Sequence, residues 1–299
     1  MPSLKAIRRR LSSVTSTRKI MRAMNMVAAS KLQRNKTQLQ KARPFFENIN
    51  NMAAGFKNSE NLQNNIFQTE NPAQNALYIV ITGDRGLCGG FNSNVTAKAL
   101  EHMTGSGIED IKIVAIGQIG HDFFARRGKS IVHKYEGVQE SAFYEDAGKI
   151  SRHLIEAYAA GKIDRVYVVY TKFESALSHV PKVEKLLPFA PGLEGTETPC
   201  AMGYDPDPAT FFENLVPVYL TAFIYIALLE SASCEQAARM MSMDTAEKNA
   251  SEIIDKLTRV YNRRRQAIIT QEISEVVSGT NVMNVKNITE KQGGAAIDH

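Results

Sequence analysis

The chain has 299 residues, a formal net charge of +5, and three cysteines, Cys88, Cys200 and Cys234, which are odd in number and far apart. This cysteine usage argues against a disulfide framework and is typical of an intracellular soluble protein. The six histidines show no metal-ligand spacing, and neither C-x-x-C nor H-E-x-x-H occurs, so we expect no metal site and no cofactor.

The N-terminal segment Ser3–Arg43 contains neither glycine nor proline. With Leu4 as the first position of a heptad, its two seam columns are apolar except at Arg18, Asn25 and Asn35, which predicts a coiled-coil helix. Pro44 is expected to end this helical run. We assign residues 1–58 to the N-terminal coiled-coil helix. The seam positions are Leu4, Ile7, Leu11, Val14, Arg18, Met21, Asn25, Ala28, Leu32, Asn35, Leu39 and Ala42.

Charge is distributed unevenly along the chain. The charged residues within 1–46 are all Lys or Arg, and there is no Asp or Glu among them. The rest of the chain therefore has a net negative charge. A basic helix can face nucleic acid, a membrane surface or an acidic protein partner. The apolar seam through the same helix favours a protein partner.

Residues 59–76 form a polar connection to a central α/β domain at 77–189. Three β-branched and aromatic runs, at 77–82, 111–117 and 165–173, are typical of buried strands. Helix-like stretches lie between them, near 93–102, 119–127 and 143–160, and predict a mostly parallel sheet with helices on its faces. Residues 171–189 are predicted to add an edge hairpin.

The segment Gly83–Gly90, which reads GDRGLCGG, follows the first predicted strand. A glycine-rich loop between a strand and a helix can hold phosphate on its backbone amides. However, it matches neither G-x-G-x-x-G nor the G-K-[ST] motif, and no base stands near Cys88 in the sequence. A tight structural turn is the better interpretation, and the sequence predicts no catalytic site.

Residues 190–210 are rich in proline and glycine and form a linker, and 211–279 form the C-terminal coiled-coil helix. Its apolar stretch at 215–229 is shorter than the roughly 20 residues that a membrane span needs, so we expect a buried helix. Gly279 is expected to end the helix, and residues 280–299 are predicted to be a disordered tail.

The two long segments differ in length. If they pair antiparallel from the same end of the body, the longer one overhangs by about 20 residues, or roughly 30 Å. That overhang, at 259–278, carries Ile268, Ile269 and Ile273 with no helix of the same chain to cover them. An exposed apolar strip of this kind implies an external partner.

Three blocks of this sequence closely resemble the gamma subunits of F-type ATP synthases of the bacterial type. They are TRKIMRAMNMVAASKL at 17–32, ITGDRGLCGGFN at 81–92 and YNRRRQAIITQEISEVVSG at 261–279. The resemblance implies an α/β fold class, in which an antiparallel coiled coil of long N- and C-terminal helices joins a central Rossmann-like α/β domain. It also implies a non-catalytic rotor shaft that couples ion flow through the c-ring to ATP synthesis or hydrolysis on the beta subunits.

The partners implied by the resemblance are three alpha and three beta subunits, the epsilon subunit and the c-ring, at the cytoplasmic face of the cell membrane. Met24 resembles the family residue near a mobile acidic loop of a beta subunit, although coil packing explains it equally well. Arg265 and Gln266 match the family pair that contacts the ring by hydrogen bonds. Ile268, Ile269 and Ile273 belong to the same expected contact with the ring.

Two other classes of function remain as alternatives. The interpretation of the chain as an enzyme depends on the glycine-rich loop, and binding of free nucleotide to the isolated chain would support it. The interpretation of the chain as a nucleic-acid-binding protein depends on the basic N-terminal helix, and steeply salt-dependent DNA binding would support it. Only the rotor shaft accounts for two long helices of unequal length.

Overall fold

The computed structural model describes residues 3–54, 65–67, 74–138, 144–175, 177–189 and 207–293. It divides into two compact units, one formed by Met24–Met243 and the other by Met1–Ala23 together with Asp244–His299. Much of the predicted connection at 59–76, most of the predicted linker (190–206) and the end of the predicted tail (294–299) lie outside the described residues.

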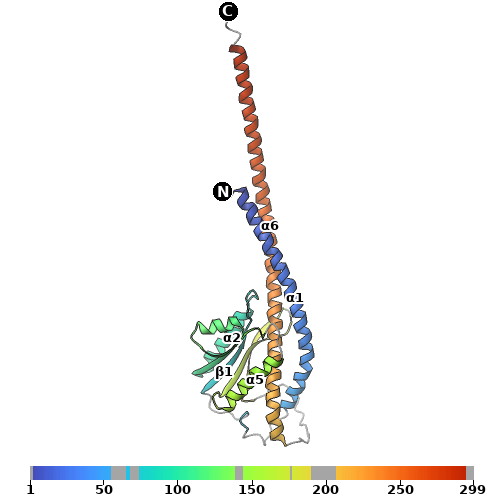
Figure 1. The fold of residues 1–299 in the computed structure, drawn as a ribbon, viewed down its shortest axis with the longest axis vertical. Helices are drawn as coiled ribbons and strands as arrows, with labels where there is room; N and C mark the ends of the chain where they lie inside the picture. The colour runs from blue at the N-terminus through green and yellow to red at the C-terminus, as the bar shows by residue number, and fades with distance from the viewer. Residues whose placement is uncertain are drawn as a thin grey trace, which may run out of the picture. The chain divides into compact units, whose positions relative to one another are not determined.

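The described part of Met24–Met243 contains a five-stranded sheet of order β3-β2-β1-β4-β5 (Figure 1). Strand β1 is parallel to β2 and β4, β2 is parallel to β3, and β4 is antiparallel to β5. The sequence correctly predicted the parallel core and the edge hairpin. The strands are β1 (Asn75–Ile81), β2 (Asp110–Ile116), β3 (Ser130–Tyr135), β4 (Arg165–Phe173) and β5 (His179–Leu187).

Helices cover both faces of this sheet. On one face, Tyr78 and Val80 of β1 pack in a cluster with side chains of α2 (Phe91–Gly105) and α3 (Gln118–Ala125). On the other face, Leu77 and Ile79 pack with α5 (Tyr144–Ala159), α1 (Leu4–Ala54) and α6 (Pro208–Gly293). The near-continuous burial of β1 follows from being covered twice.

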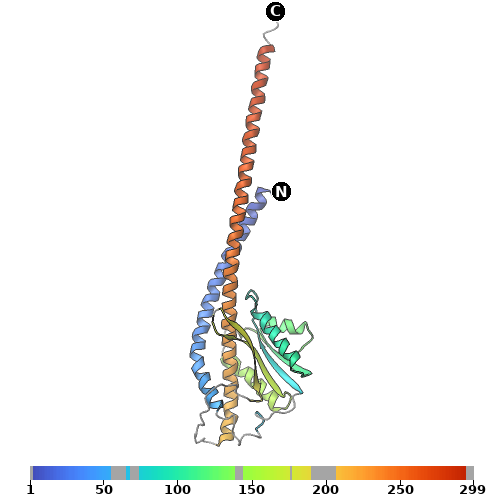
Figure 2. The same cartoon turned by 180° about the vertical axis from the view of Figure 1, so that it is seen from behind.

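Helices α1 and α6 run antiparallel within Met24–Met243. Asn25 of α1 donates a hydrogen bond to the carbonyl of Met240, whereas Phe46, further along α1, packs against Tyr219 and Phe223. Contacts that advance along one helix while they retreat along the other define an antiparallel pair, which is visible in both views (Figures 1 and 2). The fold class is therefore the one that the sequence predicts.

The heptad seam predicted for α1 is confirmed position by position. All the seam residues from Leu4 to Ala42 are buried or half-buried, whereas the neighbouring Lys and Arg side chains are mostly exposed. Of the polar seam residues, Asn25 donates a side-chain hydrogen bond across to α6 over 3.2 Å. A polar group at a seam position specifies register at some cost in stability.

The prediction that Pro44 ends the first helix is wrong. Helix α1 continues through Pro44 to Ala54, and the seam continues with it, because Phe46 is half-buried while Ile49 and Ala53 are buried. Proline removes one backbone hydrogen bond from a helix interior. Burial of the apolar side chains that follow outweighs that loss.

The predicted end of the last helix is also wrong. Helix α6 begins at Pro208 rather than at 211, contains Pro217, and continues past Gly279 to Gly293. Residues 280–293 are therefore helical and not the predicted disordered tail. Glycine lowers helix stability by about 1 kcal/mol relative to alanine, which a long helix can absorb.

The sequence did not predict strand β3. Its residues are half-buried or exposed, and the strand lies at the edge of the sheet, so it shows no run of buried side chains. By contrast, the apolar stretch of α6 is a core helix as predicted. That helix is long and apolar enough to cross a membrane by composition alone, yet 72 % of its most apolar window is buried within the protein.

The seam makes a direct prediction about stability. Leu39→Ala removes a side chain that is 3 % exposed, and we expect a loss of about 2–5 kcal/mol in the free energy of unfolding. The adjacent Gln40 is exposed, so Gln40→Ala is the matched control and should change stability by less than about 0.5 kcal/mol. Urea unfolding of the purified chain would measure both. Equal losses for the two variants would contradict the seam.

Candidate partner-binding surfaces and the joint between shaft and domain

The glycine-rich loop at 83–90 faces helix α6. An ideal Cβ added at Gly83 would lie 2.8 Å from a carboxylate oxygen of Glu235, so α6 occupies the space that a larger side chain would need. The Gly83 amide donates to the side chain of Asn92, and Arg239 donates to the carbonyl of Gly86 over 3.4 Å. The loop therefore holds a protein helix, which supports the interpretation of it as a structural turn.

Cys88 in this loop does not have the properties of a nucleophile. Its side chain is buried, and burial, together with the nearby charge of Glu235, raises the pKa of the thiol above its usual value. A reactive cysteine needs a lowered pKa and access to solvent. Cys88 instead accepts a hydrogen bond from the Asn92 side chain at 3.2 Å, which helps to hold the loop closed.

Two carboxylates of α6, Glu230 and Glu235, are buried against the rest of the unit. The Glu230 side chain is 6 % exposed and pairs with Arg43 of α1 over 3.1 Å, while it accepts a hydrogen bond from the Phe173 amide. Glu235 is 7 % exposed and pairs with Arg239 over 2.5 Å. We call Arg43, Glu230, Glu235 and Arg239 the carboxylate joint.

The joint connects three elements. Arg43 donates to Glu230 and also to the carbonyl of Phe173 at the end of β4, so one guanidinium ties α1, α6 and the sheet together. Burial raises the pKa of both Glu230 and Glu235, and the paired arginines oppose that shift. Buried ion pairs contribute little net stability, but breaking one is costly. The pair of Glu230 with Arg43 therefore helps to fix α6, and Arg239, paired with Glu235 on the same helix, bonds to the glycine-rich loop.

The sequence did not single out the joint. Its signal is two acids five residues apart inside the apolar stretch of α6, in the run LLESASCEQ. Glutamate is almost never fully buried unless it is paired. Two glutamates in a stretch that is expected to be buried therefore indicate that each has a partner in the fold. The arginine that pairs with Glu230 is far away in the sequence, however, and only the fold brings it close.

The predicted contact residue Met24 lies on α1 beside the seam. Its side chain is half-buried, and the following Met26 and Val27 are 59 % and 57 % exposed. The surface of α1 here therefore combines apolar side chains with exposed basic ones such as Arg22. Such a surface suits a partner with apolar and acidic groups, so the contact predicted for Met24 stays a prediction.

The other predicted contact residues lie near the end of α6, in the unit formed by Met1–Ala23 and Asp244–His299. Within that unit α6 continues beyond the start of α1 (Figures 1 and 2). Arg265 and Gln266 are exposed and Ile268 is half-buried. The exposed apolar side chains here are Ile269 (41 %), Ile273 (58 %), Val276 (69 %) and Val277 (53 %).

Spacings of three and four residues place Ile269, Ile273 and Val276 on one face of the helix. We call residues 265–277 the tip. An exposed apolar face on a helix marks a protein-binding surface. Five of the six predicted contact residues thus lie in the tip, and Met24 lies on α1 in the other unit.

A family model described as ATP synthase matches residues 3–283. The gamma chain of ATP synthase from Pelotomaculum thermopropionicum is 41 % identical over 93 % of this chain and 98 % of its own length. That from Alkaliphilus metalliredigens is 38 % identical over 93 % and 97 %. The chain belongs to the ATP synthase gamma chain family.

Chains in solved structures of ATP synthases have a similar fold. A chain in the central stalk and c-ring structure of the Tetrahymena thermophila mitochondrial ATP synthase matches with a TM-score of 0.62 and 25 % identity, over 76 % of this chain and 99 % of that one. A chain of the Euglena gracilis enzyme shares the fold with a TM-score of 0.68 and 15 % identity, over 95 % of both chains. This gamma chain is a non-catalytic subunit and the shaft of a rotary motor, and it associates with the membrane through its complex.

The joint predicts a pH-dependent effect on stability. Arg43 lowers the pKa of Glu230, so Arg43→Met raises it further above the value in the unfolded chain. A carboxyl whose pKa is higher in the folded state contributes less to stability as pH rises through that value. We therefore expect Arg43→Met to destabilise the chain more at pH 8 than at pH 5.

The loss at pH 8 should be about 1–3 kcal/mol, below that for a fully buried pair, because Arg43 is 46 % exposed and partly screened. Thermal unfolding at both pH values measures it. Arg34→Met, an exposed arginine on the same helix, is the control. A loss that is the same at both pH values would show that Glu230 does not depend on Arg43.

Proposed function

We propose that this gamma chain turns inside a ring of three alpha and three beta subunits, while its α/β domain is held by the epsilon subunit and the c-ring at the cytoplasmic face of the membrane. Ion flow through the c-ring then drives rotation, and rotation drives the catalytic beta subunits. The carboxylate joint carries this proposal, because a shaft must not slip relative to the domain through which it is turned.

The joint resists both rotation and sliding of α6. Glu230 and Glu235 point to different neighbours, the end of β4 with α1 in one case and the glycine-rich loop in the other. Turning α6 about its axis, or moving it along its axis, would separate Glu230 from Arg43 and from the Phe173 amide, and Arg239 from the carbonyl of Gly86. Each buried charge left unpaired costs several kcal/mol, which favours transmission of torque without slip.

The tip is proposed to be the contact with the upper part of the ring. Arg265 and Gln266 supply hydrogen-bond donors, and a guanidinium binds a carboxylate in a forked, directional manner. The apolar face of Ile269, Ile273 and Val276 supplies contact without directional bonds, which suits a surface that must turn against its partner. Met24 is proposed to face a mobile acidic loop of a beta subunit.

Neither alternative function gains support. The glycine-rich loop is occupied by α6, so a phosphate cradle there would need the joint to open. The basic helix α1 uses one face for the seam, and the comparisons with known proteins give ATP synthase throughout.

Met24→Lys tests the proposed contact with a beta subunit. The substitution places a flexible cation next to an acidic loop and adds an ion pair that resists rotation. We expect ATP hydrolysis by the complex to persist while ion pumping per ATP falls. Met26→Lys is the matched control, because Met26 lies two residues further along and on another side of the helix.

The readouts are ATP hydrolysis and acidification of membrane vesicles that contain the assembled complex. Equal pumping per ATP for Met24→Lys and the original chain would contradict the contact. Equal losses for Met24→Lys and Met26→Lys would show a general effect of charge on α1 rather than a contact at Met24.

Two truncations test the tip. A chain that ends at Ser278 keeps the tip, and we expect normal assembly and ATPase rate. A chain that ends at Arg264 lacks Arg265, Gln266 and the apolar face, so assembly or torque should weaken while thermal unfolding of the isolated chain stays cooperative. Loss of cooperative unfolding with a normal complex would show instead that the tip supports the fold.

A further inference from the structure

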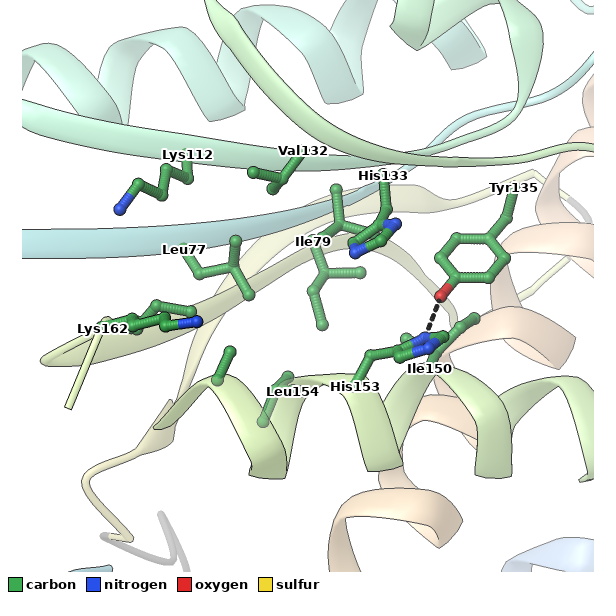
Figure 3. A pocket seen from close by; sticks show the side chains of 13 residues that line it. Leu77, Ile79, Lys112, Val132, His133, Tyr135, Ile150, His153, Leu154 and Lys162 are labelled. Carbon is green, nitrogen blue, oxygen red and sulfur yellow. Dashed lines mark hydrogen bonds between the residues drawn. The ribbon is translucent and has the colours of Figure 1, made fainter. Parts of the chain in front are cut away.

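A cavity of about 280 Å³ lies between helix α5 and one face of the sheet, over strands β1, β2 and β3 (Figure 3). Its floor is apolar and fully buried, and is formed by Leu77, Ile79, Val114, Ile150 and Leu154. The cavity belongs to the α/β domain, and none of its lining residues is part of the carboxylate joint or of the tip. It has no part in the function proposed above.

An irregularity in β3 shapes the cavity. Ile113 of β2 pairs with Ile131, but the next residue, Val114, pairs with His133, so Val132 is an extra residue in the edge strand. Beyond this bulge the alternation of side chains is reversed, and His133 and Tyr135 turn to the same face as Val114. Without the extra residue, both rings would point to the opposite face of the sheet.

The rim of the cavity is basic and aromatic. The rings of His133 and His153 are stacked, with centroids 5.2 Å apart, and the Tyr135 hydroxyl lies 2.8 Å from Nδ1 of His153 (Figure 3). Lys112 and Lys162 also line the cavity, and Lys112 is paired with Asp110 over 3.3 Å. Among the described residues that line it there is no Asp or Glu.

An apolar floor under a basic rim is complementary to a molecule with an apolar body and one negative charge. Carboxylates accept strong, charge-assisted hydrogen bonds from ammonium groups, and the N–H groups of imidazole rings are further donors. At about 30 Å³ for each non-hydrogen atom, the liquid volume of one water molecule, the cavity holds roughly ten such atoms. That is the size of an eight-carbon fatty acid.

We propose that this cavity is a binding site for a small amphipathic carboxylate, whose chain lies on the floor between the sheet and α5 and whose carboxylate is bound at the rim by Lys162 and the two histidines. Lys162 is exposed and forms no ion pair within the described part of the chain. It is therefore available to a ligand.

Calorimetric titration of the purified full-length chain with octanoate tests the site, with 1-octanol as the uncharged counterpart. We expect one octanoate to bind per chain. Lys162→Gln should weaken octanoate binding by about tenfold or more, as for loss of a hydrogen bond to a charged group, and should change 1-octanol binding by less than about twofold.

Ala157→Phe fills the cavity from α5 and should abolish binding of both molecules. Lys98→Gln is the control, because Lys98 lies on α2, which covers the opposite face of the sheet. Circular dichroism during heating checks that Ala157→Phe folds, and the exposed Lys162 keeps the test valid if it does not.

Absence of saturable octanoate binding would overturn the proposal. So would binding of several molecules per chain, or octanoate binding that Lys162→Gln and Lys98→Gln leave equally strong.

Discussion

Helix α6 packs between the sheet on one side and α1 on the other, and the remaining architecture depends on this burial. Between Phe212 and Ala237 most of its side chains are buried, on nearly every side of the helix. A helix that is apolar all round must be enclosed. Since each fully buried large apolar side chain contributes about 1.5–3 kcal/mol, this stretch is a major source of stability within Met24–Met243.

The apolar contacts and the charged contacts of this buried stretch have different roles. Apolar packing is not directional, so by itself it would tolerate small rotations of α6. The carboxylate joint adds directional bonds from α6 to its neighbours, from Glu230 to Arg43 and the Phe173 amide and from Arg239 to the carbonyl of Gly86. Stability thus comes from the apolar contacts and fixed orientation from the charged ones, which together make a rigid shaft.

Exposure increases along α6 towards its C-terminal end. Ala250 is still buried, Tyr261 is half-buried, and Ile273 is 58 % exposed. The tip is therefore built from apolar side chains that the chain itself leaves uncovered, as is expected of a subunit that functions within a larger complex. The α/β domain differs, because its helices cover both faces of its sheet.

The sequence by itself determined the seam of α1, the parallel strands, the edge hairpin and the exposed strip at Ile269 and Ile273, because each of these is a repeat in one short stretch of residues. Only the tertiary structure decided where Arg43 meets Glu230, why Gly83 must be small, and that a bulge turns His133 towards a cavity. These depend on pairs of residues that are distant in the chain. Packing also decided that α1 continues through Pro44, since the local preference of proline is weaker than the burial of Ile49 and Ala53 that follow.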